Sequence, residues 1–481
     1  MNFRPVLYVI GILLCILSAS MSIPLLVDLY FHHSDWKVFM ICMIITFFFG
    51  GLMVLTNKTD QVLIGIREGF LLTSLSWVMV SLFGALPLWL SELELSVTDA
   101  IFESVSGITT TGATIIAGLD EAPPGILLWR AILQWLGGIG IIVMALSLLP
   151  FLGIGGMQLF RAESSESEKV MPRATELATS IFYLYTSLTL LCMICYVIAG
   201  FNLFDAIAHA MTTIATGGFS TYDTSFMNHE GHGKEIVAII FMIVGALPFV
   251  LYLKALQGKP ICLYKDTQIR WFFSILIISY FLLTAWMLWR DPFGFENDQI
   301  LKVIFTVTAI VTGTGYTSID YNSWGTFAVA TLFFLMVVGG CAGSTSCGIK
   351  IFRFQIIYAV TKTQIKRLLT PHGVFTSLYN DKPIPPDVPL SVMSFFFLFA
   401  LSFTLLALLL SLTGLDYITA MSGAASAIAN VGPGLGPIIG PTGNYASLTD
   451  TAKWLLSFGM ILGRLELFTV MVMLLPRFWK A

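Results

Sequence analysis

The chain has 481 residues, of which 57% are hydrophobic and only 11% are charged, and its mean hydropathy is +0.86. A soluble globular domain carries about 25% charged residues, so this composition excludes a soluble enzyme, a disordered protein and a nucleic-acid-binding protein. The net charge of −3 indicates no polyanionic partner. The sequence therefore predicts an integral membrane protein that contacts lipid and no nucleic acid.

Ten apolar segments are each long enough to cross a hydrocarbon core, which takes about 20 residues of helix. They lie at 5–30, 36–56, 68–90, 126–150, 176–200, 235–256, 271–290, 325–349, 390–413 and 452–476. Four shorter apolar segments lie between them, at 97–111, 203–215, 300–312 and 416–430. Segments of about 13–15 residues are too short to span, so we expect these four to enter the membrane and return on the same side.

The basic residues test this topology. With a cytoplasmic N-terminus, threading ten spans places 18 Lys and Arg residues inside and 6 outside, with Arg464 inside the last span. This asymmetry follows the positive-inside rule. Counting any one short segment as a full span would invert the rest of the chain. The four short segments are therefore expected to enter from the outer face, and both termini are expected in the cytoplasm.

After the first two helices, one pattern occurs four times: a span, a short segment, a glycine-containing turn and a second span. The turns are Thr110-Thr111-Gly112, Thr216-Gly217-Gly218, Gly313-Thr314-Gly315 and Asn430-Val431-Gly432. The pattern predicts an extra helix pair at 1–60 and pore repeats at 61–155, 156–260, 261–370 and 371–481. The expected fold is an all-α polytopic membrane protein of ten transmembrane helices, eight of which form four pseudo-fourfold repeats around one axial pore.

Four irregular turns at membrane depth are suited to binding a monovalent cation. Irregular backbone is tolerated there only beside protein or water, and its carbonyl oxygens can replace an ion's hydration shell. Glycine permits positive φ, so successive carbonyls can face the same way, and the threonines add hydroxyls. The turns hold no carboxylate, which argues against calcium or magnesium. Glycine used only for helix packing is the alternative, but four copies after four short segments favour a filter.

Residues 106–114, 214–221, 312–317 and 422–434 resemble the filter segments of the Trk/Ktr/HKT superfamily of potassium transporters. Over nearly its whole length the chain is similar to the TrkH-type membrane subunit of bacterial potassium uptake systems. The resemblance implies potassium as the transported ion, with rubidium tolerated, held at the twelve turn residues in the bacterial inner membrane. It also implies a homodimer and a cytoplasmic nucleotide-binding regulatory ring of the TrkA type. In the family a serine at the first filter glycine accompanies sodium permeability, so Gly112 favours potassium.

Arg464 lies about 12 residues into the last span, near the bilayer centre. A mid-span arginine costs about 2.5–3.5 kcal/mol on insertion, so it faces water or a partner. Glu466 is two residues away and does not face it on a helix, whereas a structural ion pair with another helix stays open. The resembling family carries an arginine on this helix just below the filter. We therefore expect Arg464 to raise the barrier to cations while the pore is closed.

Segment 339–348 interrupts the eighth span with small residues. Four glycines in ten positions break a helix. Gly339 and Gly343 have the spacing of a helix-packing motif, but packing does not require the other glycines or the Ser-Thr-Ser run. The resemblance implies an intramembrane gating loop beneath the third turn, formed by Gly339, Gly340, Gly343, Ser344, Thr345 and Gly348.

The sequence contains no nucleophile–base pair, metal-ligand cluster or phosphate-binding glycine loop, so an enzyme is disfavoured and no cofactor is expected besides the transported ion. A symporter that couples potassium to protons or sodium at the same site remains the alternative. Symporters typically show inverted repeats, whereas these four repeats share one orientation. The sequence therefore favours channel-like uptake through a carbonyl-lined filter, gated by the loop and Arg464.

Overall fold

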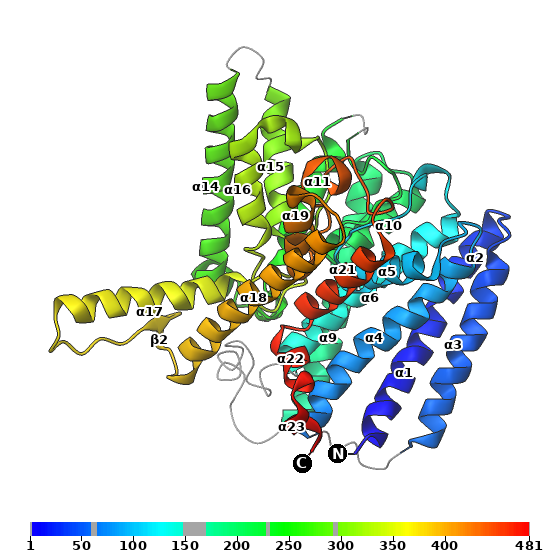
Figure 1. Ribbon diagram of the computed structural model, residues 1–481, viewed down its shortest axis with the longest axis horizontal. Coiled ribbons are helices and arrows are strands. Elements are labelled where there is room, and N and C mark those ends of the chain that lie inside the picture. Colours follow the sequence, from blue (N-terminus) through cyan, green and yellow to red (C-terminus); the bar gives the residue numbers. More distant parts are fainter. Residues whose placement is uncertain (1, 59–64, 148–169, 228–230, 292–296, 481) are drawn as a thin grey trace.

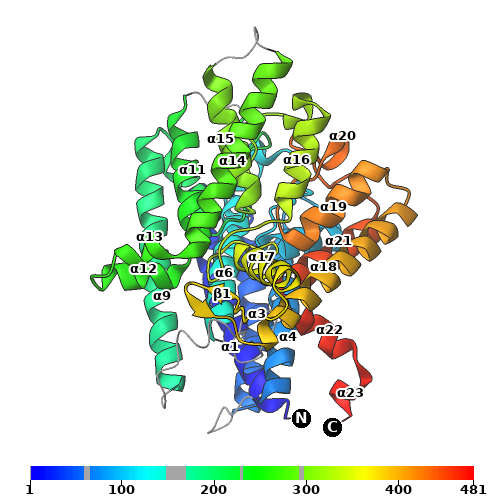
Figure 2. The same cartoon turned by 90° about the vertical axis from the view of Figure 1, so that its left-hand side faces the viewer.

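The computed structural model describes residues 2–58, 65–147, 170–227, 231–291 and 297–480. Within these ranges the molecule is a bundle of helices, and both described ends of the chain lie at the same end of the bundle (Figures 1 and 2). Seven helical segments are long and apolar enough to cross a membrane. They are α1 with α2 (Arg4–Ser20 and Ser22–Tyr30), α3 (Trp36–Thr56), α4 (Ile66–Leu90), α6 (Pro124–Ser147), α9 (Val170–Ile198), α14 (Thr267–Arg290) and α18 (Asp387–Leu412).

Two further segments are bent pairs of helices. The pair α11 (Gly233–Ala246) and α12 (Phe249–Leu256) bends by 92°, and the pair α21 (Asp450–Arg464) and α22 (Phe468–Leu474) bends by 113°. The second bend lies at Glu466 and Leu467, whose φ angles of 62° and 49° end the helix. Counting each pair as one span gives up to nine spans in the described part of the chain, against the predicted ten.

The difference lies at the predicted span 325–349. Its helix, α16 (Thr326–Met336), has only 11 residues and ends before the glycine-rich segment. Gly339, Gly343 and Gly348 adopt φ angles of 75°, 75° and 80°, which turn the chain out of the helix. The next helix, α17 (Ile351–Leu369), projects from the bundle together with the antiparallel strands β1 (Leu378–Tyr379) and β2 (Lys382–Pro383), as Figure 1 shows.

All four predicted short helices are present, and we call them the pore helices. They are α5 (Val97–Ile108), α10 (Leu203–Ile214), α15 (Asn297–Val311) and α19 (Tyr417–Ala429). Ser96 caps α5 and Asn202 caps α10, each by accepting the N–H of an aspartate in the first turn. Asp416 is itself the N-cap residue of α19, whereas Asp99 and Asp205 lie in the first turn of their helices. For this reason Asp416 lies three residues further from its turn glycine than Asp99 and Asp205 lie from theirs.

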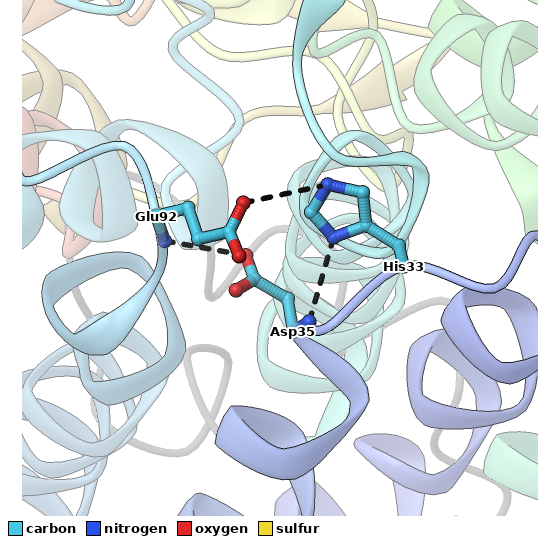
Figure 3. A group of neighbouring side chains, drawn as sticks. All are labelled: His33, Asp35 and Glu92. Carbon is cyan, nitrogen blue, oxygen red and sulfur yellow. Dashed lines mark hydrogen bonds and ion pairs between the residues drawn. The ribbon is translucent and has the colours of Figure 1, made fainter.

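The first helices pack tightly on the rest of the bundle. A Cβ at Gly11 would lie 2.8 Å from the carbonyl oxygen of Gly50, so α1 and α3 cross in close contact. At the end of this pair, His33 Nε2 lies 3.7 Å from Glu92 Oε2, just after α4 (Figure 3). The Asp35 carboxylate accepts the Glu92 N–H at 3.4 Å. These contacts join the helix pair to the residues that follow α4.

Candidate ion pathway

The four glycine turns share one backbone conformation. In each turn the first residue and the glycine two positions later have positive φ, whereas the residue between them does not. The angles are 53° and 84° at Thr110 and Gly112, 49° and 80° at Thr216 and Gly218, 73° and 76° at Gly313 and Gly315, and 53° and 105° at Asn430 and Gly432. Each first residue also donates its N–H to the carbonyl three residues earlier, at the end of its pore helix. The turns are therefore four copies of one structure.

Close approaches between the turns form a closed ring. A Cβ built on each turn glycine would collide with the carbonyl oxygen of the middle residue of the next turn. The distances are 2.2 Å from Gly112 to Gly217, 1.8 Å from Gly218 to Thr314, 1.9 Å from Gly315 to Val431, and 2.7 Å from Gly432 to Thr111. Because the fourth contact returns to the first turn, the four turns surround one axis. We call the oxygens of Thr111, Gly217, Thr314 and Val431 the carbonyl ring.

The ring is buried and polar. Thr110, Thr111, Thr314 and Asn430 are fully inaccessible, and Thr216 is nearly so. On the side of the residues that follow the turns, a cavity of about 70 Å³ is lined by all four turn glycines together with residues such as Asn444 and Tyr445. That volume holds a few water molecules. The cavity supplies a wet approach to the ring from one side.

Each turn is braced by polar side chains. The hydroxyls of Thr109 and Thr111 lie 2.7 Å apart, and those of Thr312 and Thr314 lie 2.8 Å apart. Tyr445 donates its hydroxyl to the Gly432 carbonyl at 2.8 Å. Buried polar groups with satisfied hydrogen bonds hold a single geometry, so these contacts fix the turns.

Two residues near the ring were missed by sequence reasoning, Arg130 and Gln134. Arg130, one of the six basic residues that the predicted topology places outside, pairs with Glu103 at 2.8 Å and donates to the Ser220 carbonyl at 2.9 Å. Gln134 hydrogen-bonds to the second turn. The available signal was two polar residues four positions apart in an apolar helix, because such residues share a face and polar groups within spans mark function.

Segment 339–348 packs against the C-terminal ends of two pore helices, α10 and α15. Thr345 donates its hydroxyl to the carbonyls of Gly245 at 2.9 Å and Ile214 at 3.1 Å, the latter being the last residue of α10. Ser346 donates its hydroxyl to the Thr312 carbonyl at 2.6 Å, just after α15. Both hydroxyl residues are fully buried. The structure thus brings the predicted loop together with the second and third turns.

The other residues of segment 339–348 also make hydrogen bonds or close packing contacts. The Gly343 carbonyl accepts the Phe249 N–H at 3.0 Å, at the bend between α11 and α12. Ser344 bonds within the loop, to the Cys341 carbonyl at 2.7 Å. Gly340 has no room for a side chain, because its Cβ would lie 2.7 Å from Ser346. Gly339 and Gly348 pack on each other, with a Cβ at Gly348 only 2.8 Å from the Gly339 Cα.

Arg464 is 1% exposed and contacts this loop directly. Its guanidinium donates to the Thr345 carbonyl at 3.2 Å and to the Gly137 carbonyl at 3.1 Å, and it touches the Cys347 sulfur. Among the described residues, no carboxylate lies within ion-pair distance of Arg464. Its charge is therefore held by backbone oxygens, and the alternative of an ion pair to another helix finds no support.

Glu466 pairs instead with the start of α17. Its carboxylate lies 2.8 Å from Lys350 Nζ and also contacts the Arg353 guanidinium. All three side chains are at most 4% exposed. Lys350 and Arg353 are among the 18 basic residues that the predicted topology places inside. The structure buries them in an ion-pair cluster that joins the end of the loop to the bend between α21 and α22.

Known proteins that match this chain are cation and potassium transport proteins. The family model TrkH, described as a cation transport protein, matches residues 35–480. The Trk system potassium uptake protein TrkI of Halomonas elongata is 45% identical over 481 residues, covering 100% of this chain and 97% of that protein. The TrkH protein of Escherichia coli K12 is 34% identical, covering 100% of both chains.

A solved structure also matches the whole chain. The crystal structure of the potassium transporter TrkH from Vibrio parahaemolyticus superposes with a TM-score of 0.92 at 35% identity, covering 100% of both chains. These matches confirm the predicted family, the helical membrane fold and the expectation of a transporter rather than an enzyme. The chain belongs to the TrkH family of cation transport proteins.

Proposed function

We propose that this chain carries potassium ions, and rubidium in their place, into the bacterial cell through the carbonyl ring in a channel-like manner. The closed ring is the observation that carries the proposal. Carbonyl oxygens arranged about one axis can replace the hydration shell of a monovalent cation. Relatives named as potassium uptake proteins support potassium as that ion.

The proposed ion ligands come from the twelve predicted turn residues in all four repeats. The pore helices end directly before these turns, so their negative dipole ends favour a cation there. The shared backbone conformation supports four equivalent repeats, at 61–155, 156–260, 261–370 and 371–481, preceded by the helix pair at 1–60. Every turn glycine is required, because a side chain would displace a ring oxygen.

The gate in this proposal is the buried loop 339–348 together with Arg464. The loop lies against the inner ends of α10 and α15, and Arg464 bonds to it from the last helix. Because no described carboxylate pairs with it, the Arg464 guanidinium repels cations in a low-dielectric site. Opening then requires the loop and Arg464 to move aside together.

The proposed setting is the bacterial inner membrane, with both termini in the cytoplasm. Two observations support this orientation: the 18 to 6 distribution of basic residues, and the location of both described chain ends at one end of the bundle. The proposed assembly is a homodimer on which a cytoplasmic nucleotide-binding ring of the TrkA type docks. The Trk system names of the relatives support such a partner.

Reversal potentials test the proposed function. The full chain is reconstituted in liposomes, and separate gradients of potassium, sodium and protons are imposed. Channel-like uptake predicts a reversal potential that follows the potassium gradient alone. A potential that shifts with the proton or sodium gradient at fixed potassium would contradict it, and a reversal potential set by a fixed potassium-to-proton or potassium-to-sodium stoichiometry would establish the alternative, a potassium symporter using the same site.

A further inference from the structure

Gln134 is fully buried and uses both ends of its side-chain amide on a single turn. Its Nε2 donates to the Gly217 carbonyl at 2.7 Å, and its Oε1 accepts the Phe219 N–H at 3.1 Å. Gln134 belongs to α6 of the first repeat, whereas the turn belongs to the second. One side chain therefore clamps two backbone groups of a neighbouring turn.

The clamp explains why the second turn differs from the others. The middle residue is Thr111, Thr314 or Val431 in three turns but Gly217 in the second. A Cβ at Gly217 would lie 2.4 Å from both Cδ and Oε1 of Gln134. The Gln134 amide therefore occupies the space that a side chain fills in the other turns.

The clamp also replaces a missing brace. In the first and third turns the middle threonine bonds to a threonine two residues earlier, at 2.7 and 2.8 Å. In the fourth, the Ser426 hydroxyl bonds to the Gly432 N–H at 3.1 Å and carbonyl at 2.8 Å. The second turn has Ala215 and Gly217 at the threonine positions, so it carries no hydroxyl there. Gln134 supplies the polar contact from outside the turn.

We propose that Gln134 is a positioning residue that sets the preference of the carbonyl ring for potassium over sodium. This inference rests on the proposed function. The Gly217 oxygen belongs to the ring, and a donor on it both fixes its position and weakens its field toward the ion. A weaker and more rigid field favours the larger ion, whose hydration shell is easier to replace. Without the clamp, the Gly217-Gly218 pair has the freedom to close around sodium.

The test uses the full-length chain in liposomes with potassium on one side and sodium on the other. Gln134→Ala is expected to lower the potassium-to-sodium permeability ratio about tenfold, equivalent to about 1.4 kcal/mol, while potassium flux persists. Gln134→Met, which keeps the shape without the hydrogen bonds, is expected to do the same and serves if the alanine variant does not fold. Gln355→Ala is the matched control, a buried glutamine on α17 whose Oε1 has no partner among the described residues.

A second pair of variants distinguishes a positioning role of Gln134 from general damage to the fold. Gly217→Thr alone is expected to abolish flux because it collides with Gln134, whereas Gly217→Thr combined with Gln134→Ala is expected to recover flux. A wild-type permeability ratio in the Gln134 variants, or normal flux in Gly217→Thr with Gln134 in place, overturns the inference. If the unaltered chain itself shows no potassium selectivity, the proposed function fails instead, so the two failures are distinct.

Discussion

Gly218 shows how little space the carbonyl ring leaves. Its φ is +80°, and a Cβ there would lie 1.8 Å from the Thr314 oxygen, far inside van der Waals contact. We expect Gly218→Ala to reduce rubidium uptake at least about a hundredfold, because the backbone must shift at the ion site. The control is Gly51→Ala on α3, whose Cβ meets no described atom within 4 Å. Similar uptake by the two variants would show that the ring does not conduct.

Among the described residues, the charge of Arg464 is held by backbone oxygens, the Cys347 sulfur and the ring of Trp77, and by no carboxylate. Arg464→Ala removes a positive charge from the proposed path and also releases a loop contact. Potassium uptake is therefore expected to rise, by about tenfold if the charge contributes about 1.4 kcal/mol to the barrier. Flux into liposomes measures this, with Arg477→Ala near the C-terminus as the charge-matched control. Unchanged or reduced uptake in Arg464→Ala contradicts a gating role.

Asp35, directly before α3, makes the stability of the folded chain depend on pH (Figure 3). Burial raises the pKa of its carboxyl above the ordinary value of 3.8, although the Glu92 N–H and His33 oppose the shift. The folded state therefore binds the proton more tightly than the unfolded state, and this carboxyl's contribution to stability falls as pH rises through the raised pKa.

Asp35→Asn removes this penalty while an amide oxygen can still accept the Glu92 N–H. We expect the variant to melt at a higher temperature than the unaltered chain at pH 7.5, with the difference shrinking toward pH 4. Thermal unfolding in detergent at both pH values measures it. A difference that does not depend on pH would show that the Asp35 charge is not penalised.

Between elements, the cluster of Glu466 with Lys350 and Arg353 joins the bend of α21 and α22 to α17. Glu466→Gln removes the carboxylate charge that pairs with two buried cations. Breaking a buried ion pair from one side typically costs about 3–5 kcal/mol, so we expect a large fall in the melting temperature. Glu92→Gln is the control, because its exposed pair with His33 is worth about 0–1 kcal/mol. Equal melting temperatures would rule out a coupling role for the cluster.

The pore helices were predictable from the sequence because their short length and the glycine after each are local signals. The interruption at 339–348 was also predictable, from its four glycines, but the end of α16 at Met336 was not, because the apolar residues that follow it keep the hydropathy of the segment high. The bend at Glu466 was not predictable from hydropathy either. It depends on positive φ at two ordinary residues, held by contacts with α17.

The candidate ion site likewise has parts that the sequence predicts and parts that it does not. The four turns were identified because each is written in three consecutive residues, and the structure places all four in one ring. The Gln134 clamp joins residues 83 positions apart, and the Arg464 contacts with Thr345 and Gly137 span 119 and 327 positions. Such contacts depend on how the repeats pack, and no local pattern encodes them.

In the whole molecule, polar contacts connect each repeat to the next. Lys302 pairs with Glu235 at 2.5 Å between the third and second repeats, and Lys453 pairs with Asp99 at 2.6 Å between the fourth and first. Arg130 bonds to Ser220 between the first and second, and Asn322 Nδ2 donates to the Gly436 carbonyl at 3.3 Å between the third and fourth. All four predicted boundaries are therefore bridged by polar contacts.

Anomalous diffraction from crystals grown in rubidium tests most directly whether the four turns bind a dehydrated ion. The expected result is a rubidium peak on the axis, within coordination distance of the oxygens of Thr111, Gly217, Thr314 and Val431, and weakened when potassium replaces rubidium. Crystals that hold rubidium only elsewhere, with no peak inside the ring, would contradict a carbonyl-lined filter in this chain.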